Sequence, residues 1–233
     1  MDYMTENHPT SRPVHDYLPA AGRDALLPFY DLMSLVLGAG EVHERLLAEA
    51  TPCGPRILEI GCGTGNLLVR AARGASDLTV VGCDPDPRAV DRARRKVRRL
   101  PGVRVDVAYA QRLPYPDASF DTVLSALMWH HLDGEAKTAA AAEVARVLRP
   151  GGSLYLADLL EHGHGGTRGG THGHGRRGHG LHAAFSRRIT EAGHRVDDAG
   201  IVESLAGAGL RATRLGEARL RVGTVGCFRA DRT

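Results

Sequence analysis

The residues best suited to chemistry in this sequence stand at the ends of short apolar runs. Ile57, Leu58 and Ile60 form one such run, and Gly61, Gly63 and Gly65 follow it at alternate positions. A second run, residues 78–83, leads into Asp84. Glycines let the chain turn tightly and let a ligand approach the backbone, and an acid that ends the second strand can accept hydrogen bonds from a ribose diol. The spacing therefore indicates a site for an adenosine-type cofactor.

The residues after the glycine loop argue against cofactors that carry phosphate groups. A P-loop needs Lys and Ser or Thr after its last glycine, whereas Asn66 and Leu67 follow Gly65. The dinucleotide fingerprint needs a glycine where Asn66 stands. The loop thus favours a cofactor with little or no phosphate. A nicotinamide or flavin oxidoreductase is the alternative, and a titration with both kinds of cofactor would decide between them.

In combination and in order, the motifs of this chain resemble one enzyme family. Residues 59–65 with Asp84 are similar to the class I S-adenosylmethionine-dependent methyltransferases, and residues 119–121 and 147–152 resemble that family's later motifs. Residues 30–33 resemble the branch that contains the ubiquinone and menaquinone methyltransferases. The resemblance covers about residues 27–160 and, faintly, 197–230. It implies an enzyme that uses S-adenosylmethionine to methylate a small-molecule acceptor.

The resemblance also implies a set of cofactor-binding residues. Glu59 would act near the ammonium group of the methionyl end, and Asp84 would bind the ribose. Where related enzymes have an acid near the adenine, this chain has Tyr109, so the Ala110 backbone and the Gln111 amide are expected to hold the adenine instead. The full set comprises Tyr30, Glu59, Gly61, Cys62, Gly63, Gly65, Asp84, Pro85, Ala110, Gln111 and Ser125.

Two adjacent histidines follow the fourth apolar run. His130 and His131 come just after residues 121–126, and the end of a strand beside the cofactor is where substrate groups bind in such folds. Imidazole titrates near pH 6.5, so either histidine is a candidate general base. The alternative is a histidine that caps a helix or packs beneath a lid. Oxygen, nitrogen and carbon acceptors all remain open.

The elements around these residues alternate between strand and helix, which predicts a parallel sheet. We expect an α/β, Rossmann-like sheet of seven strands, mostly parallel with an antiparallel C-terminal strand, with helices on both faces and an N-terminal helical lid. The strands are expected at 56–60, 78–83, 103–107, 121–126, 153–158, 210–216 and 219–228. The helices are expected at 23–39, 41–50, after the glycine loop, 87–100, 134–148 and 198–209.

The chain divides into residues 1–50, an arm with lid helices, and residues 51–233, the methyltransferase domain with an insertion at about 159–195. Between His162 and His182 this insertion holds six histidines and nine glycines, a composition that cannot form a packed core. We expect a mobile surface loop that binds divalent metal weakly and is not a defined metal site. A metal-binding protein on a methyltransferase scaffold, with this segment as its working part, is the second alternative.

Composition and charge limit the possible binding partners and the cellular location of the protein. The formal net charge is only +3, and the arginines of the helix expected at 87–100 are interpreted as a solvated face, so nucleic acid is not expected. The sequence has no apolar run long enough for a membrane span and no visible secretion signal, which favours a cytoplasmic protein. Cys53, Cys62, Cys83 and Cys227 are expected to be free thiols. The oligomeric state cannot be read from the sequence.

Overall fold

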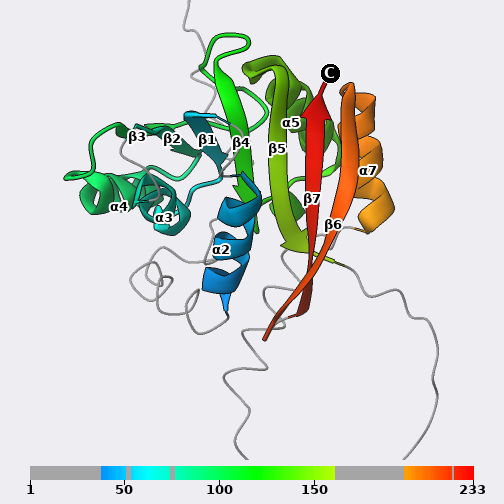
Figure 1. Ribbon diagram of the computed structural model, residues 1–233, viewed down its shortest axis with the longest axis horizontal. Coiled ribbons are helices and arrows are strands. Elements are labelled where there is room, and N and C mark those ends of the chain that lie inside the picture. The colour runs from blue at the N-terminus through cyan, green and yellow to red at the C-terminus, as the bar shows by residue number, and fades with distance from the viewer. Residues whose placement is uncertain (1–37, 51–53, 74–76, 161–196, 222) are drawn as a thin grey trace, which may run out of the picture.

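A seven-stranded sheet with helices on both faces forms the framework of the protein (Figure 1). The computed structural model describes residues 38–50, 54–73, 77–160, 197–221 and 223–233. The elements are α2 (Ala39–Ala50), β1 (Arg56–Ile60), α3 (Asn66–Arg73), β2 (Thr79–Asp84), α4 (Pro87–Val97), β3 (Val103–Val107), β4 (Phe120–Ala126), the 3-10 helix η3 (Trp129–His131), α5 (Gly134–Val147), β5 (Leu148–Leu159), α7 (Asp198–Gly207), β6 (Leu210–Leu220) and β7 (Gly223–Arg232).

The strand order is β3-β2-β1-β4-β5-β7-β6. Strands β1 to β5 pair in parallel, and β7 runs antiparallel to both of its neighbours. The expected mostly parallel sheet with an antiparallel C-terminal strand is confirmed. The order reverses between β1 and β4, and the crevice at such a switch point, beyond the carboxyl ends of the strands, is where open α/β sheets bind ligands.

Apolar side chains from the strands fill both faces of the sheet, because a parallel sheet is covered on both sides. On one face, α2, α3 and α4 contribute to a core around Leu124 and Tyr155. On the other, α5 and α7 pack against Leu156 and Phe228. This arrangement leaves the carboxyl ends of the parallel strands free for a functional site.

Several predicted boundaries need correction. The helix expected at 87–100 ends at Val97, and its N-cap is Asp86, whose side chain accepts from the Arg88 N–H. The helix expected at 198–209 ends at Gly207, and its N-cap is Asp197. The last two strands, expected at 210–216 and 219–228, run instead over Leu210–Leu220 and Gly223–Arg232. Polar residues at these ends allow more than one cap, and packing selects among them.

The segment 150–152 also behaves differently from expectation. The helix expected at 134–148 and the strand expected at 153–158 leave residues 149–152 outside both elements, yet α5 ends at Val147 and β5 begins at once at Leu148. The register between β4 and β5 shifts between Phe120 and Thr122, which accommodates these residues inside the strand. A bulge of this kind absorbs extra residues in one strand without ending the pairing.

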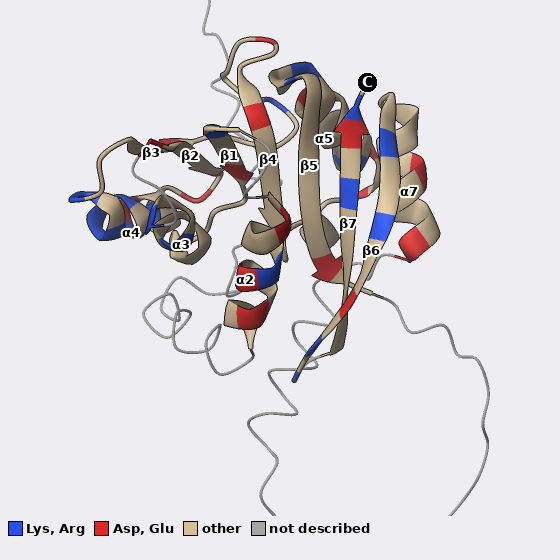
Figure 2. Ribbon diagram, in the orientation of Figure 1, with Lys and Arg blue, Asp and Glu red and all other residues tan. Residues whose placement is uncertain are grey.

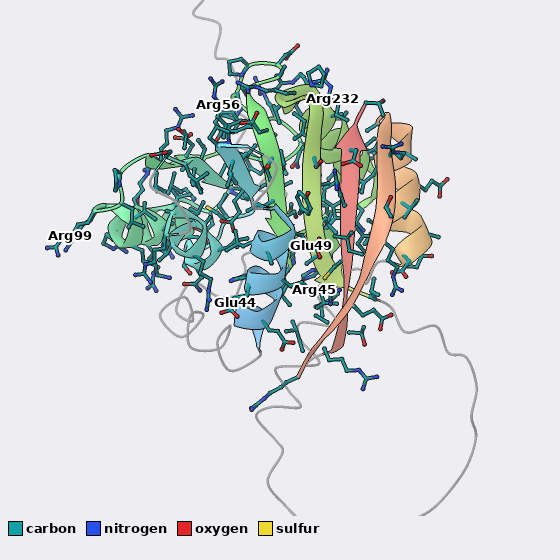
Figure 3. The ribbon with its side chains drawn as sticks, viewed as in Figure 1. Glu44, Arg45, Glu49, Arg56, Arg99 and Arg232 are labelled. Atoms are coloured by element: carbon teal, nitrogen blue, oxygen red, sulfur yellow. The ribbon has the colours of Figure 1, made fainter. Side chains whose placement is uncertain are left out.

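Helix α2 corresponds to the second of the two expected N-terminal helices, whereas residues 23–37 of the first lie outside the described residues. Arg45 on α2 points toward the C-terminal strands (Figure 3) and donates to the Glu217 carbonyl over 2.6 Å. A Cβ on Gly216 would lie 2.7 Å from the Arg45 guanidinium, so the glycine makes room for this contact. The contact joins the N-terminal helix to the β6–β7 hairpin.

Basic residues gather on α4, as Figure 2 shows. Arg88 and Arg95 are exposed there, Arg92 is half-buried, and Arg99 is exposed just beyond the end of the helix. Arg94 pairs with Asp91 on the same surface. These exposures agree with the interpretation of a solvated helix face.

Candidate functional site

The carboxyl ends of the parallel strands bring most of the predicted site residues to one edge of the sheet. Beyond β1 lies the glycine loop, and β2 ends in Asp84. The Ala108 N–H donates to the Asp84 carbonyl over 3.2 Å, which ties the segment after β3 to the same edge. Beyond β4 lies η3 with His130 and His131. Tyr30 lies outside the described residues.

Each glycine of the loop has a left-handed backbone, with φ of +68° at Gly61, +50° at Gly63 and +81° at Gly65. A Cβ on Gly65 would lie 2.9 Å from the Ala93 Cβ, so this glycine permits close packing of α4. A Cβ on Gly61 would lie 2.7 Å from the Met128 Cβ and nearer still to its Cγ. Gly61 and Gly63 are half-buried, whereas Gly65 is buried. The first two glycines therefore form the accessible part of the loop.

Asp84 holds the glycine loop in place. Its Oδ2 accepts the Gly63 N–H over 2.8 Å, and its Oδ1 accepts the Asp86 N–H over 2.9 Å. Burial raises the pKa of Asp84, while both hydrogen bonds oppose that shift. Each carboxylate oxygen can accept a second hydrogen bond, so Asp84 can also receive donors from a ligand.

Glu59 is a deeply buried acidic group beside the glycine loop. It lies on β1 with 3% of its surface exposed, and its Oε2 has no hydrogen-bond partner within the described residues. Burial, followed by the charge of Asp84, raises the pKa of Glu59 well above its usual value, and a hydrogen bond from the Leu68 backbone opposes this. A buried acceptor without a donor is costly. A cationic ligand group at this position would remove that cost.

The other predicted cofactor residues occupy varied positions. The Cys62 side chain is buried in the core, and burial raises the pKa of its thiol, so only its backbone could face a ligand. Ser125 is also buried, and its hydroxyl has no partner in the described part of the chain. Ala110 is buried, while Pro85 and Gln111 are half-buried. Cys62, Cys83 and Cys227 are free thiols as expected, and Cys53 lies outside the described residues.

A buried histidine–aspartate pair stands beside the loop. The Nδ1 of His130 lies 2.5 Å from Asp158 Oδ1, and the His130 backbone N–H donates to Asp158 Oδ2 over 3.0 Å. Burial disfavours protonation of His130, but the charge and hydrogen bond of Asp158 raise its pKa above the usual 6.5. Burial likewise opposes ionisation of Asp158, yet the His130 charge and three hydrogen bonds lower its pKa. The carboxylate orients the imidazole and strengthens it as a base.

His131 has a different environment. Its ring centroid lies 4.0 Å from that of His130. Burial, and then the charge on His130, lowers the pKa of His131 to about 4. Its buried Nδ1 has no partner among the described residues. His131 is therefore neutral at physiological pH and a weaker base than His130.

Sequence reasoning missed Asp158 and Met128. Asp158 ends an apolar run, residues 154–157, in the same way that Asp84 ends its own run, so an acid at the end of the fifth strand was a usable signal. No comparable signal marked Met128. Its place depends on the backbone of Leu127, which has an unusual φ of +55°.

Neither a metal site nor a membrane span is present in the described residues. In the ranges that the structure describes, no group of three or more His, Cys, Asp or Glu side chains could hold a metal ion. No helix there is long and apolar enough to cross a membrane. The His- and Gly-rich stretch, residues 162–182, lies outside these ranges.

Comparison with known proteins identifies the domain. Residues 57–152 match the family model described as a methyltransferase domain. These residues form a methyltransferase domain. The resemblance seen in the motifs is thereby confirmed, as is S-adenosylmethionine as the expected cofactor. Over 140 residues the chain is 36% identical to a demethylmenaquinone methyltransferase of Deinococcus radiodurans, an alignment that covers 58% of this chain and 57% of that protein.

Solved structures share the fold. An S-adenosylmethionine-dependent methyltransferase of Aquifex aeolicus superposes with a TM-score of 0.63 at 18% identity, covering 90% of this chain and 98% of that one. The [4+2]-cyclase SpnF superposes with a TM-score of 0.67 at 18% identity, covering 89% and 93% of the two chains. Because the second protein is named for a cyclisation, the fold alone does not decide the reaction. The site residues must carry that argument.

Proposed function

We propose that the protein is an S-adenosylmethionine-dependent methyltransferase that methylates a hydroxyl group of a small-molecule acceptor, with His130 as the general base. The observation that carries the proposal is the buried pair of His130 and Asp158 at the edge of the sheet that also holds the glycine loop. A base oriented by a carboxylate suits an acceptor that must lose a proton as it reacts.

The residues present fit the cofactor. Glu59 offers a buried carboxylate oxygen that lacks a donor, which suits the ammonium group of the methionyl end. Asp84 is oriented by two backbone N–H groups and retains accepting capacity for a ribose diol. The half-buried Gly61 and Gly63 let a ligand lie close to the backbone between these two acids.

When bound, S-adenosylmethionine supplies a methyl group already activated by the positive charge on its sulfur. His130 donates its Nδ1–H to Asp158, so its Nε2 is left to accept the proton of the acceptor hydroxyl. The Asp158 carboxylate then stabilises the imidazolium that forms, as a buried anion does for a neighbouring cation. Glu59, Asp84 and the loop hold the donor in one orientation, which supplies much of the rate through alignment.

The other predicted base, His131, does not fit this role as well, because its pKa is lowered to about 4. Its unpartnered Nδ1 and the free hydroxyl of Ser125 are instead positions where a bound molecule could find hydrogen bonds. Amine and carbon acceptors are the competing acceptor classes. They depend less on His130, or depend on it for a different proton transfer, than a hydroxyl acceptor does.

Two measurements test the proposal. Calorimetry should show that the native protein binds S-adenosylhomocysteine, and mass spectrometry should show transfer of one methyl group to members of a panel of phenols and alcohols but not to matched amines. His130→Gln should bind the cofactor as the native protein does while turnover falls by roughly 10²–10⁴-fold. Full activity in that variant would remove His130 as the base, and absence of cofactor binding would refute the methyltransferase assignment of the whole protein.

A further inference from the structure

One side chain beside the glycine loop has no role in the proposal above. Met128 is half-buried and lies against Gly61, where a Cβ on the glycine would sit 2.7 Å from the Met128 Cβ and 3.6 Å from its sulfur. The contact is specific to a glycine at position 61, since any larger residue would collide with the methionine. The first glycine of the loop therefore accommodates a side chain from beyond β4.

The backbone fixes Met128 in this position. Leu127 adopts a φ of +55°, an uncommon and strained value for a residue other than glycine, and its N–H donates to the Ala157 carbonyl over 2.8 Å. Strain of this kind persists only where the surroundings enforce it, and it is concentrated at functional sites. The Met128 carbonyl also accepts the His131 N–H over 3.0 Å, so Met128 begins η3 as well as touching the loop.

Met128 thus connects the two halves of the proposed site. On one side it contacts Gly61 of the cofactor loop, and two residues later His130 is held by Asp158 on β5. A donor on the loop and an acceptor beside His130 must approach to about 3–3.5 Å to react. That approach has to occur in the space between Gly61 and His130.

We propose that the side chain of Met128 contacts the sulfur end of the bound S-adenosylmethionine and holds it facing His130, which makes Met128 a positioning residue for methyl transfer. This inference rests on the proposed function. A thioether suits the position because it is unbranched and polarisable, and it is apolar enough to keep water from the reacting groups.

The first test observes Met128 directly in the native protein, and a variant is needed only to assign its signal. The chain has four methionines, so a sample labelled with ¹³C at the methionine methyl groups gives a simple spectrum, and the signal missing from Met128→Leu assigns the resonance. Titration with S-adenosylhomocysteine should shift that resonance with the same Kd that calorimetry gives. A Met128 signal that stays fixed at saturation, while calorimetry records binding, would overturn the inference and leave the proposed function standing.

The second test uses variants with a matched control. Met128→Ala should bind S-adenosylhomocysteine about tenfold more weakly, since a buried apolar contact is lost, while Met128→Leu should stay within about threefold of the native protein. Leu132→Ala removes an apolar side chain at the other end of η3 that packs, like Met128, against the core but is not among the atoms nearest Gly61, and it should leave affinity within about twofold. Native-like binding by Met128→Ala, or an equal loss in Leu132→Ala, would contradict a specific contact. Failure of the native protein to bind would instead refute the proposed function.

Discussion

The Nδ1 of His130 lies 2.5 Å from a carboxylate oxygen of Asp158, although the two residues are 28 positions apart in the sequence. Both side chains are buried. A base must be neutral to accept a proton, so turnover in the native protein should rise with pH through the pKa of His130, which Asp158 raises above 6.5. Because burial alone would lower this pKa, removing the charge should reverse the direction of the shift.

Asp158→Asn tests this relationship. The amide removes the charge and no longer fixes the tautomer, so we expect turnover to fall by about 10²-fold or more and the acidic limb of the pH–rate profile to move to lower pH. The measurement is kcat against pH, with S-adenosylhomocysteine affinity as the control, which should stay unchanged. A profile that keeps its native midpoint would show that Asp158 does not set the pKa of the catalytic group.

Glu59 should couple cofactor binding to a proton. Burial and the Asp84 charge raise the pKa of Glu59 well above its usual value, and a bound ammonium group would favour the ionised form, so binding should release protons. Calorimetry of S-adenosylhomocysteine binding in two buffers of different ionisation enthalpy measures this release as a difference in apparent enthalpy. Glu59→Gln should abolish the difference and weaken binding by about 1.5–3 kcal/mol. An enthalpy that does not depend on the buffer in the native protein would place the ammonium group elsewhere.

Asp84 contributes to both the loop and the ligand. Asp84→Ala removes the acceptor of the Gly63 N–H as well as the proposed ribose contact, and we expect S-adenosylhomocysteine to bind about 1.5–3 kcal/mol more weakly. Asp84→Asn keeps one oxygen that can accept the Gly63 N–H but loses the charge and the acceptor of the Asp86 N–H, so it should lie between Ala and native in a calorimetric comparison. Unchanged affinity in Asp84→Ala would remove this residue from the site.

The sequence predicts the strands and the cofactor loop because both depend on local patterns. Residues 57–60 and 80–83 are buried throughout and, apart from Glu59, carry no charged side chain, which is typical of strands covered on both faces, and the alternate glycines mark the turn between β1 and α3. The pairing of β4 with β1 follows from the family topology. These local signals account for Glu59, Gly63 and Asp84 in the candidate site.

Contacts between distant segments account for what the sequence left open. Asp158 meets His130 only because β5 lies beside β4, and Met128 reaches Gly61 only because Leu127 adopts a left-handed backbone that few residues other than glycine take. Helix caps depend on packing as well. Asp84, Asp86, Asp197 and Asp198 are chemically equivalent as caps, and tertiary packing chooses between them.

An ion pair on α5 fastens the segment after β3. Arg146 donates to the carbonyls of Leu113 and Tyr115 over 3.0 and 2.7 Å, and Glu143 accepts the Leu113 N–H over 2.6 Å. Because Ala110 and Gln111 lie on the same segment, Arg146→Ala should reduce the free energy of unfolding by about 2–3 kcal/mol and also weaken S-adenosylhomocysteine binding.

The matched control for that change is Arg149→Ala. Arg149 pairs with Asp121 over 2.7 Å and does not contact residues 109–117 in the hydrogen bonds described. Urea unfolding should show some loss of stability in this variant, while calorimetry should show native affinity for S-adenosylhomocysteine. Equal losses of affinity in both variants would mean that the Arg146 contacts stabilise the whole domain rather than the segment after β3.

His43 should make the protein sensitive to acid. It is 8% exposed on α2, and burial, followed by the charge of Arg70, lowers its pKa from 6.5 to about 4. The unfolded chain takes up a proton near pH 6.5 while the folded protein does so only near pH 4, so stability is complete above pH 6.5 and falls as the pH drops through that window. At 1.36 kcal/mol per pKa unit, this histidine can account for a loss of up to about 3 kcal/mol in the free energy of unfolding.

The free energy of urea unfolding at pH 7.5 and pH 4.5 should therefore differ less in His43→Gln than in the native protein. His131, whose pKa is also lowered to about 4, contributes a separate dependence that should persist in this variant and decrease only in the double variant with His131→Gln. An identical pH dependence in native protein and His43→Gln would show that His43 is not held neutral by the fold.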